Sequence, residues 1–154
     1  MVSTLTGFVL RRGYRGEVTD SPAWVDEYGR IVFDVFAKNC TSRATLEHLT
    51  GKWGTLVMTA LRDGTLRFNA LRRRVSGVSE KMLAQTLQAL ERDGFVLREA
   101  QTAIPPRVEY SLTPMGQRIA DKLMDLIESV EELMPDVSTA QGEYDRSKQH
   151  ARGS

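Results

Sequence analysis

The hydrophobic and polar positions between residues 79 and 94 follow the period of an amphipathic helix. One face collects leucines that recur four and three residues apart, namely Leu83, Leu87 and Leu90. The opposite face collects polar side chains, namely Lys81, Gln85, Gln88 and Arg92. Ser79 is placed to cap the first turn, and Gly94 is placed to end the last one. The leucines predict a helix that packs on a core, and the polar face needs a separate explanation.

Two helices and a short supporting helix are predicted before this one. The stretch "TSRATLEHL" predicts the first, with Thr41 or Ser42 as its N-cap and Gly51 at its end. The stretch "KWGTLVMTALRDG" predicts the second, because its apolar residues form a helical stripe. In "TLRFNALRRRV", Leu66 to Phe68 fits a short strand, and the residues that follow fit a brief helix.

After Gly94 the pattern changes from helical to alternating. The stretches "FVLREA" and "VEYSL" alternate on either side of the proline-bounded "QTAIPPR", which predicts a hairpin with a long loop. Thr113 and Pro114 then suit the cap and first residue of a long helix. Its apolar stripe consists of Ile119, Leu123, Leu126, Ile127, Val130, Leu133 and Met134. Because one small core cannot cover so long a stripe, Pro114 to Met134 is predicted to be chiefly a dimer helix.

The two ends of the chain carry weaker signals. Residues 1–37 mix glycines and aromatic side chains without a sustained period, and we interpret them as a partly ordered arm. The stretch from Ile31 to Asn39 fits a short strand and the first turns of a helix equally well. Residues 135–154 are polar, and we interpret them as a flexible tail.

The order of the predicted elements indicates the architecture. Helix, helix, short helix, Ser-Gly turn, capped helix and two-stranded hairpin follow one another as in a winged helix-turn-helix. The predicted fold class is mainly α with a small antiparallel β wing and with extra N- and C-terminal dimerisation helices. A winged-helix domain for DNA binding and dimerisation is expected over residues 38–134, between the arm and the tail.

Composition excludes several other classes. The chain has 154 residues, of which 41% are hydrophobic and 27% charged, and these values suit a single globular domain. The sequence contains no signal peptide and no membrane-spanning run, so we expect a cytoplasmic protein without membrane contact. One cysteine and two distant histidines predict neither a disulfide nor a metal site. Without a nucleophile motif or a phosphate-binding loop, we expect neither enzymatic activity nor a cofactor.

The formal net charge of +1 hides an uneven distribution. Residues 51–113 hold ten basic and six acidic residues, a local charge of +4. Residues 114–154 hold five basic and eight acidic residues, a local charge of −3. The basic middle segment suits a polyanionic partner, although a run of charge can also be a solvated surface.

The predicted fold, the basic segment and the polar helix face together predict binding to double-stranded DNA. Lys81, Gln85 and Gln88 can read base edges in the major groove. Ser79 can reach a phosphate or a base edge. The other candidates are arginines that we expect at the DNA backbone or in the minor groove, namely Arg67, Arg72, Arg73, Arg74 and Arg107.

Two other interpretations of the same residues remain open. The polar helix face can serve solubility alone. Alternatively, the helix and the hairpin can form a winged-helix protein interaction module that docks a partner without binding DNA. The basic middle segment and the run from Arg72 to Arg74 favour DNA over both.

Five short motifs occur in a set order along the middle of the chain. They are Gly-Lys-Trp at Gly51 to Trp53, the pair Arg67-Phe68, "SEKML" from Ser79, "LERDG" from Leu90 and "PPRVEYSLT" from Pro105. This pattern resembles the HxlR-type family of bacterial winged-helix transcriptional regulators, relatives of the MarR-like repressors. The resemblance extends more loosely from Cys40 to about Met134. It implies a homodimer that binds an inverted-repeat operator and so resides on the bacterial nucleoid.

Cys40 lies near the start of the first predicted helix, where many members of this family carry a cysteine that senses electrophiles or oxidants. The resemblance therefore implies a redox-responsive regulator whose effector is a small electrophile or oxidant. A helix N-terminus lowers the pKa of a thiol, which raises the fraction of reactive thiolate. A lone cysteine also fits a small buried hydrophobic residue, and the sequence leaves both interpretations open.

Overall fold

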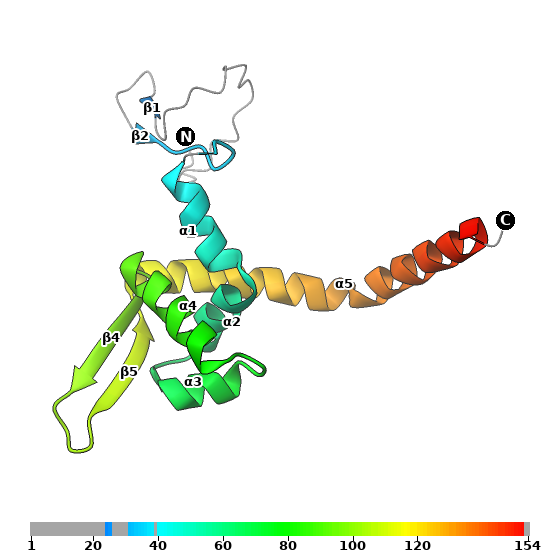
Figure 1. Ribbon diagram of the computed structural model, residues 1–154. Coiled ribbons are helices and arrows are strands. Elements are labelled where there is room, and N and C mark those ends of the chain that lie inside the picture. Colours follow the sequence, from blue (N-terminus) through cyan, green and yellow to red (C-terminus); the bar gives the residue numbers. More distant parts are fainter. Residues whose placement is uncertain (1–23, 26–30, 39, 153–154) are drawn as a thin grey trace, which may run out of the picture. The chain divides into compact units, whose positions relative to one another are not determined.

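The computed structural model of the chain describes three stretches, residues 24–25, 31–38 and 40–152 (Figure 1). The chain divides into two compact units, Met1–Ala44 and Thr45–Ser154. Most of the elements that the sequence assigns to a winged helix belong to the second unit.

The first unit contains a two-stranded antiparallel pair. Strand β1 (Trp24–Val25) pairs with strand β2 (Ile31–Val32). The stretch from Ile31 to Asn39, for which the sequence allowed a strand or a helix, therefore begins as a strand. Most of the arm predicted over residues 1–37 lies outside the described residues.

The helices predicted before the hairpin are present. They are α1 (Thr41–Thr50), α2 (Lys52–Ala60), α3 (Phe68–Arg74) and α4 (Glu80–Arg92). The first of them begins at Thr41 itself, so the prediction of Thr41 or Ser42 as its N-cap is wrong. Ser79 caps α4 as predicted, since its Oγ accepts a hydrogen bond from the backbone N–H of Met82 at 3.1 Å. Gly94 follows the end of α4 with φ of +80°, a conformation that glycine adopts without strain.

The predicted hairpin is confirmed, and it forms part of a three-stranded sheet. Strand β4 (Val96–Gln101) pairs antiparallel with β5 (Arg107–Leu112), in a register that runs from Val96 opposite Leu112 to Gln101 opposite Arg107. The short strand β3 (Leu66–Arg67) pairs with the other edge of β5. We call the β4–β5 hairpin the wing. Because α3 begins directly after β3, whose Arg67 pairs with Glu109, the start of α3 lies beside the middle of the wing.

The core of the second unit lies between α2, α4 and α5 (Pro114–Arg152). Its largest fully buried side chains come from α2, α3 and α4 and from the residue that follows α2, namely Val57, Met58, Leu61, Leu71, Leu83, Leu87 and Leu90. Burying each such side chain contributes roughly 1.5–3 kcal/mol, so this cluster holds the helices together. At the rim, Arg62 donates from Nε to Oδ1 of Asp121 at 2.8 Å, and this hydrogen bond lowers the pKa of the Asp121 carboxyl.

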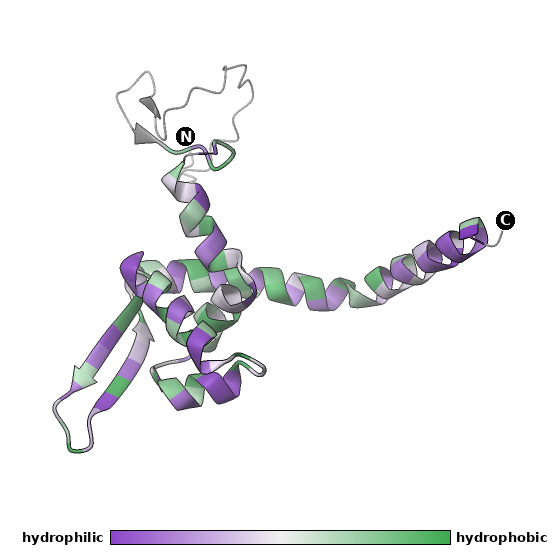
Figure 2. Cartoon of the chain, in the orientation of Figure 1, coloured by the Kyte–Doolittle hydropathy of each residue, from purple (hydrophilic) through white to green (hydrophobic). Residues whose placement is uncertain are grey.

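Helix α5 begins as predicted but extends further than predicted. The Oγ1 of Thr113 accepts a hydrogen bond from the backbone N–H of Gly116 at 3.0 Å, so Thr113 caps the helix. The interpretation of residues 135–154 as a flexible tail is wrong, because α5 continues through Pro135 to Arg152. Once a packed first half has nucleated a helix, each further residue except Pro135, which has no backbone N–H, adds a hydrogen bond without a new nucleation cost. Figure 2 shows hydrophobic residues in the middle of α5 and mainly hydrophilic ones toward its end.

The fold as a whole is the predicted winged helix-turn-helix, mainly helical with a small antiparallel sheet. Among the described residues, no helix combines the length and the apolar character that crossing a membrane requires.

Two glycines of α5 allow a matched test of the packing. A Cβ added at Gly116 would lie 2.0 Å from the backbone oxygen of Phe95, whereas a Cβ added at Gly142 would meet nothing within 4 Å. We expect Gly116→Ala to lower the free energy of unfolding by about 1–3 kcal/mol or more, because backbone has to shift. Gly142→Ala should raise helix stability by up to about 1 kcal/mol. Urea unfolding of both variants measures the difference, and equal midpoints would contradict this account of the α5 contact.

Candidate nucleic-acid interface

The two faces of α4 have opposite environments. Leu83 and Leu90 are completely buried and Leu87 nearly so, whereas the predicted base-reading side chains Lys81, Gln85 and Gln88 are all exposed. The core packing of the leucines sets the rotation of the helix about its axis. The polar face is therefore presented to solvent in one defined orientation.

The N-terminal end of α4 lies beside a polar hollow. Its lining residues come from α3, from the turn and from the start of α4, and include Asn69, Arg72, Arg73, Ser79 and Glu80. Ser79 uses its hydroxyl oxygen to cap the helix, which leaves the hydroxyl proton free to donate outward. A hydroxyl donor beside an arginine suits a phosphate oxygen.

The three arginines at the end of α3 do not act as one group. Arg72 donates from Nη1 to Oε1 of Glu80 at 2.8 Å, so its charge is partly offset. Arg73 is exposed and has no ion-pair partner within the described part of the chain. Arg74 lines a different hollow, between α2 and α5, together with Leu56 and Ile127. The structure thus places Arg72 and Arg73 beside α4 and Arg74 elsewhere.

A basic groove lies between α3 and the wing. It brings together three of the predicted arginines, Arg67, Arg73 and Arg107, over an apolar floor that includes Phe68 and Pro105. Arg67 lies 3.8 Å from Glu109, from Nε to Oε1, which is a loose ion pair between partly exposed groups. Arg107 is exposed and unpaired within the described ranges. The groove therefore carries a net positive charge of a kind that attracts a phosphate backbone.

Two residues of this surface escaped the sequence reasoning. Ile104 at the tip of the wing is fully exposed, at 101% of its reference area. Lys52, at the start of α2, borders a hollow together with Gln85 and Trp53, and its Nζ lies 4.5 Å from the Trp53 ring centroid. The "IPP" run in the hairpin loop indicates the exposure of Ile104, because an apolar residue in a turn has no core to enter. No sequence signal brings Lys52 next to Gln85.

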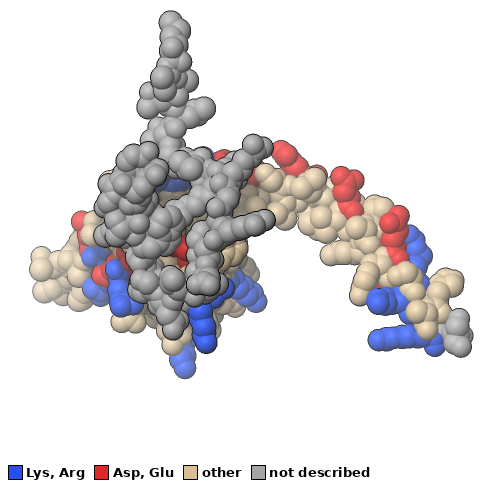
Figure 3. Space-filling view, turned by 90° about the horizontal axis from the view of Figure 1, so that it is seen from above, with Lys and Arg blue, Asp and Glu red and all other residues tan. Residues whose placement is uncertain are grey.

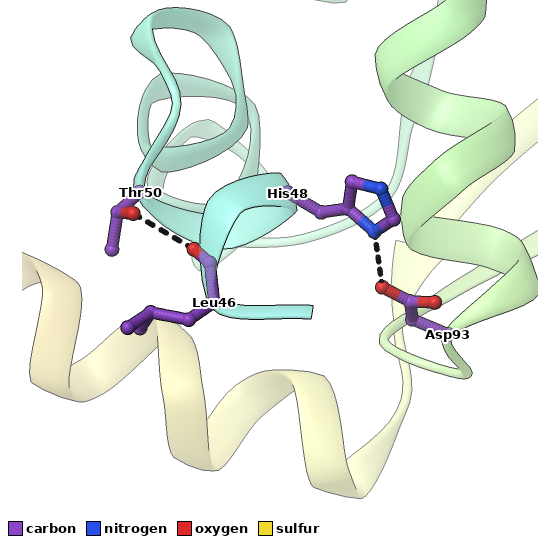
Figure 4. Close-up of polar contacts among 4 residues, drawn as sticks. All are labelled: Leu46, His48, Thr50 and Asp93. Atoms are coloured by element: carbon purple, nitrogen blue, oxygen red, sulfur yellow. Dashed lines mark hydrogen bonds and ion pairs between the residues drawn. The ribbon is translucent and has the colours of Figure 1, made fainter. Parts of the chain in front are cut away.

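The C-terminal end of α4 contacts α1 through a polar pair of side chains. Nδ1 of His48 lies 2.6 Å from Oδ2 of Asp93, which follows the last residue of α4 (Figure 4). Asp93 is only 12% exposed at its side chain, so water screens this contact less than a surface pair. The contact joins the last turn of α1 to the C-terminal end of the helix that carries the candidate base-reading residues.

Cys40 combines features of both interpretations left open by the sequence. Its side chain is buried, with 3% of its area exposed. Its Sγ lies 3.0 Å from the Oγ of Ser42, and this hydrogen bond lowers the pKa of the Cys40 thiol despite the opposing effect of burial. The thiol thus sits just before α1 with an environment that favours thiolate. In the described stretches, no group of three or more His, Cys, Asp or Glu side chains is placed to hold a metal ion.

Comparisons with known proteins agree with this geometry. A family model described as HxlR-like helix-turn-helix matches residues 48–138. An HTH-type transcriptional regulator of Escherichia coli (strain K12), YtfH, is 51% identical over 110 residues, which is 71% of this chain and 87% of the relative.

Solved structures give the same result. The transcriptional regulator ytfH from Salmonella typhimurium superposes with a TM-score of 0.68 at 51% identity, covering 71% of this chain and 97% of that one. The redox regulator HypR in its oxidized form superposes with a TM-score of 0.56 at 36% identity, covering 60% of this chain and 96% of that one. By its sequence and its fold, the chain belongs to the HxlR-like helix-turn-helix family of transcriptional regulators.

Proposed function

We propose that this regulator binds an inverted-repeat DNA operator as a homodimer, with α4 in the major groove and the wing along the backbone or the minor groove. The observation that carries the proposal is the exposed polar face of α4, together with the basic groove between α3 and the wing, which shares Arg73 with the hollow at the start of α4. Polar side chains on a rigidly packed helix can read base edges, and exposed arginines beside it supply the electrostatic attraction.

The residues divide into two roles by position. Lys81, Gln85 and Gln88 lie on the helix face and are proposed to contact bases. Arg67, Arg73 and Arg107 line the basic groove and are proposed to contact phosphates, with Ser79 and Arg72 beside the start of α4. Arg74 faces the hollow between α2 and α5, so we no longer propose it as a DNA contact.

The proposed dimer uses exposed apolar residues of α5 and α1. Leu126, Val130 and Leu133 are 55%, 49% and 54% exposed on α5, and Leu46 is 44% exposed on α1. A run of large apolar side chains that one chain leaves in water suits a self-complementary interface. Two-fold symmetry would then present two copies of α4 to two half-sites of a palindromic operator.

Redox sensing through Cys40 is the finer part of the proposal. The similarity to HypR, named as a redox regulator, supports it together with the lowered thiol pKa. Helix α1 starts at Thr41, directly after Cys40, and its last turn carries His48, which contacts Asp93 at the end of α4. A modification that shifts α1 is therefore proposed to alter the position of the DNA-reading helix.

Base reading and backbone contact can be separated by two substitutions. Gln85→Ala should cost ~1–3 kcal/mol at its cognate base pair and relax selectivity there. Arg107→Ala should weaken all sequences alike and reduce the slope of log affinity against log salt by roughly one unit for each protomer.

Arg118→Ala serves as the control, because Arg118 is exposed on α5 outside the proposed interface and should leave affinity unchanged. Titration of operator variants at several salt concentrations measures both effects. If Arg107→Ala changed base preference while Gln85→Ala did not, the placement of helix and wing would be wrong. A flat salt dependence of the unmodified protein would favour the protein interaction module instead.

The proposed dimer predicts an oligomeric state. The full chain should sediment as a dimer at micromolar concentration, and Leu126→Glu should shift it toward monomer, since a buried unpaired carboxylate opposes association. The neighbouring Asp125→Asn removes a charge from an already polar position and should leave the dimer intact. Sedimentation equilibrium measures all three proteins, and a monomeric unmodified chain would exclude the proposed interface.

The lowered pKa of Cys40 predicts both reactivity and its pH range. Because the thiolate is the nucleophile, alkylation by iodoacetamide should reach half its maximal rate below about pH 8.5, the value for an unperturbed thiol. Addition of the Cys40 thiol to a quinone should weaken operator binding, and Cys40→Ser should be insensitive to the reagent. Mass spectrometry confirms the modification, and unchanged operator affinity of the modified protein would leave Cys40 as a buried hydrophobic residue.

A further inference from the structure

The second half of α5 carries an apolar stripe that nothing in its own unit covers. The stripe positions recur four and three residues apart. Up to residue 144 they are apolar, namely Leu126, Val130, Leu133, Val137, Ala140 and Tyr144, and the small residues Ser147 and Ala151 continue the spacing. Each of these residues is exposed. In Figure 1, this part of α5 extends beyond the other elements of its unit. An alternation of four and three over consecutive heptads is the repeat of a left-handed coiled coil.

In the first half of α5, the same stripe is covered by the core of its own unit. Gly116, Ile119 and Leu123 occupy the preceding positions of the repeat, and they pack against the core of their own unit. One apolar face therefore runs along the whole of α5, with its first part covered by the domain. A heptad spacing drifts by only about 20° per heptad around a straight helix, so the uncovered part continues nearly the same face and is free to pack on another helix.

The residues least suited to an interface lie away from the stripe. Pro135 and Gly142 occupy the position of the heptad that is opposite the stripe, so the hydrogen bond that Pro135 cannot donate is missing from the outer side of the helix. Glu128 and Gln149 share that outer side. Figure 3 shows the acidic side chains set along α5 and the basic ones gathered near its end. The polar surface of the helix is thus segregated from the apolar one.

We infer that residues 126–151 of α5 pair in parallel with the same segment of a second copy of this chain, as a two-stranded coiled coil. The inference deepens the proposed dimer and rests on it for the identity of the partner. The family model ends at residue 138, so the last part of the coiled coil is a feature of this chain beyond the matched region.

The charges beside the stripe determine the parallel orientation. In a parallel pair, a residue before the stripe faces the residue five positions later in the other helix. Glu143 then faces Lys148 of the second copy, and Asp136 faces Gln141 of the second copy. In the antiparallel pairings of the same segment, Asp136 and Glu143 face each other or themselves, which places acidic groups together.

A disulfide experiment on the full-length chain tests the stripe and its orientation. In a Cys40→Ser background the introduced thiol is the only one, because the chain has a single cysteine. Ala140→Cys places the thiol on the stripe, where the two copies of residue 140 face each other in a parallel pair, and mild oxidation should link most of the protein as a dimer. Thr139→Cys is the matched control one residue away, off the stripe, and should link at least several times more slowly. Equal rates at the two positions, or no link at residue 140, would overturn the inference.

A charge exchange tests the register independently. Glu143→Lys should raise the dissociation constant of the dimer roughly two- to fivefold at low salt, since it sets a lysine at residue 143 of each copy against Lys148 of the other copy. Adding Lys148→Glu should restore the original value, whereas Asp145→Lys, an equal change of charge away from the stripe, should have a smaller effect. Failure of the double variant to recover would contradict the parallel register.

The two proposals fail separately. A dimer that links through residue 140 but binds no palindromic DNA would refute the proposed function and support the coiled coil. A dimer that binds its operator but links no faster at residue 140 than at residue 139 would refute the coiled coil alone.

Discussion

The burial of three leucines of α4 is the constraint on which the rest of the interface depends. Leu83, Leu87 and Leu90 together contribute several kcal/mol of hydrophobic stabilisation, at roughly 1.5–3 kcal/mol each. A rotation of α4 by one residue, about 100°, would expose them and bring Lys81 or Gln88 toward the core at a comparable further cost. The polar face is thereby held in a single orientation. Its exposure follows from core packing, so the residues available to a ligand are set before any ligand is present.

Electrostatics around the turn between α3 and α4 refine that surface. The pair between Arg72 and Glu80 is exposed on both sides, and such pairs contribute about 0–1 kcal/mol. A phosphate that replaces Glu80 as the partner of Arg72 would therefore lose little. Arg73 and Arg107 have no such competitor within the described residues, and the groove that they share with Arg67 remains positive. The strength of the positive potential comes from the arginines that lack an acidic neighbour, and not from the length of the arginine run.

Much of the fold could be predicted from the sequence, because its signals are local. The stripe of Leu83, Leu87 and Leu90, the cap at Ser79 and the alternation on either side of Pro105 each depend on residues a few positions apart. The exposure of Lys81, Gln85 and Gln88 follows from the same stripe.

The remaining features depend on contacts between distant residues. The approach of Glu80 to Arg72 requires α3 and α4 to be placed, as does the contact of His48 with Asp93, which are 45 residues apart. Arg74 lies away from Arg72 and Arg73, and the sequence already predicts this. Consecutive helical residues point about 100° apart, so three in a row cannot share one face. The end of α5 was missed because a polar segment reads as a tail when it is considered without the helix that precedes it.

The same four-and-three spacing of residues on α5 runs from the part that packs on the core to the part that extends beyond it. Gly116 allows the close approach to Phe95, and Leu123 completes the buried part of the stripe. These contacts fix the rotation of α5 just as the leucines fix that of α4. Because a helix is a stiff element that rises about 1.5 Å per residue, the rotation set at Gly116 also determines where Leu126, Val130 and Leu133 point, between the domain and Pro135. The core of one chain therefore orients the surface through which two chains can meet. A change in core packing at Gly116 would be transmitted along α5 to that surface without any change in the surface residues themselves.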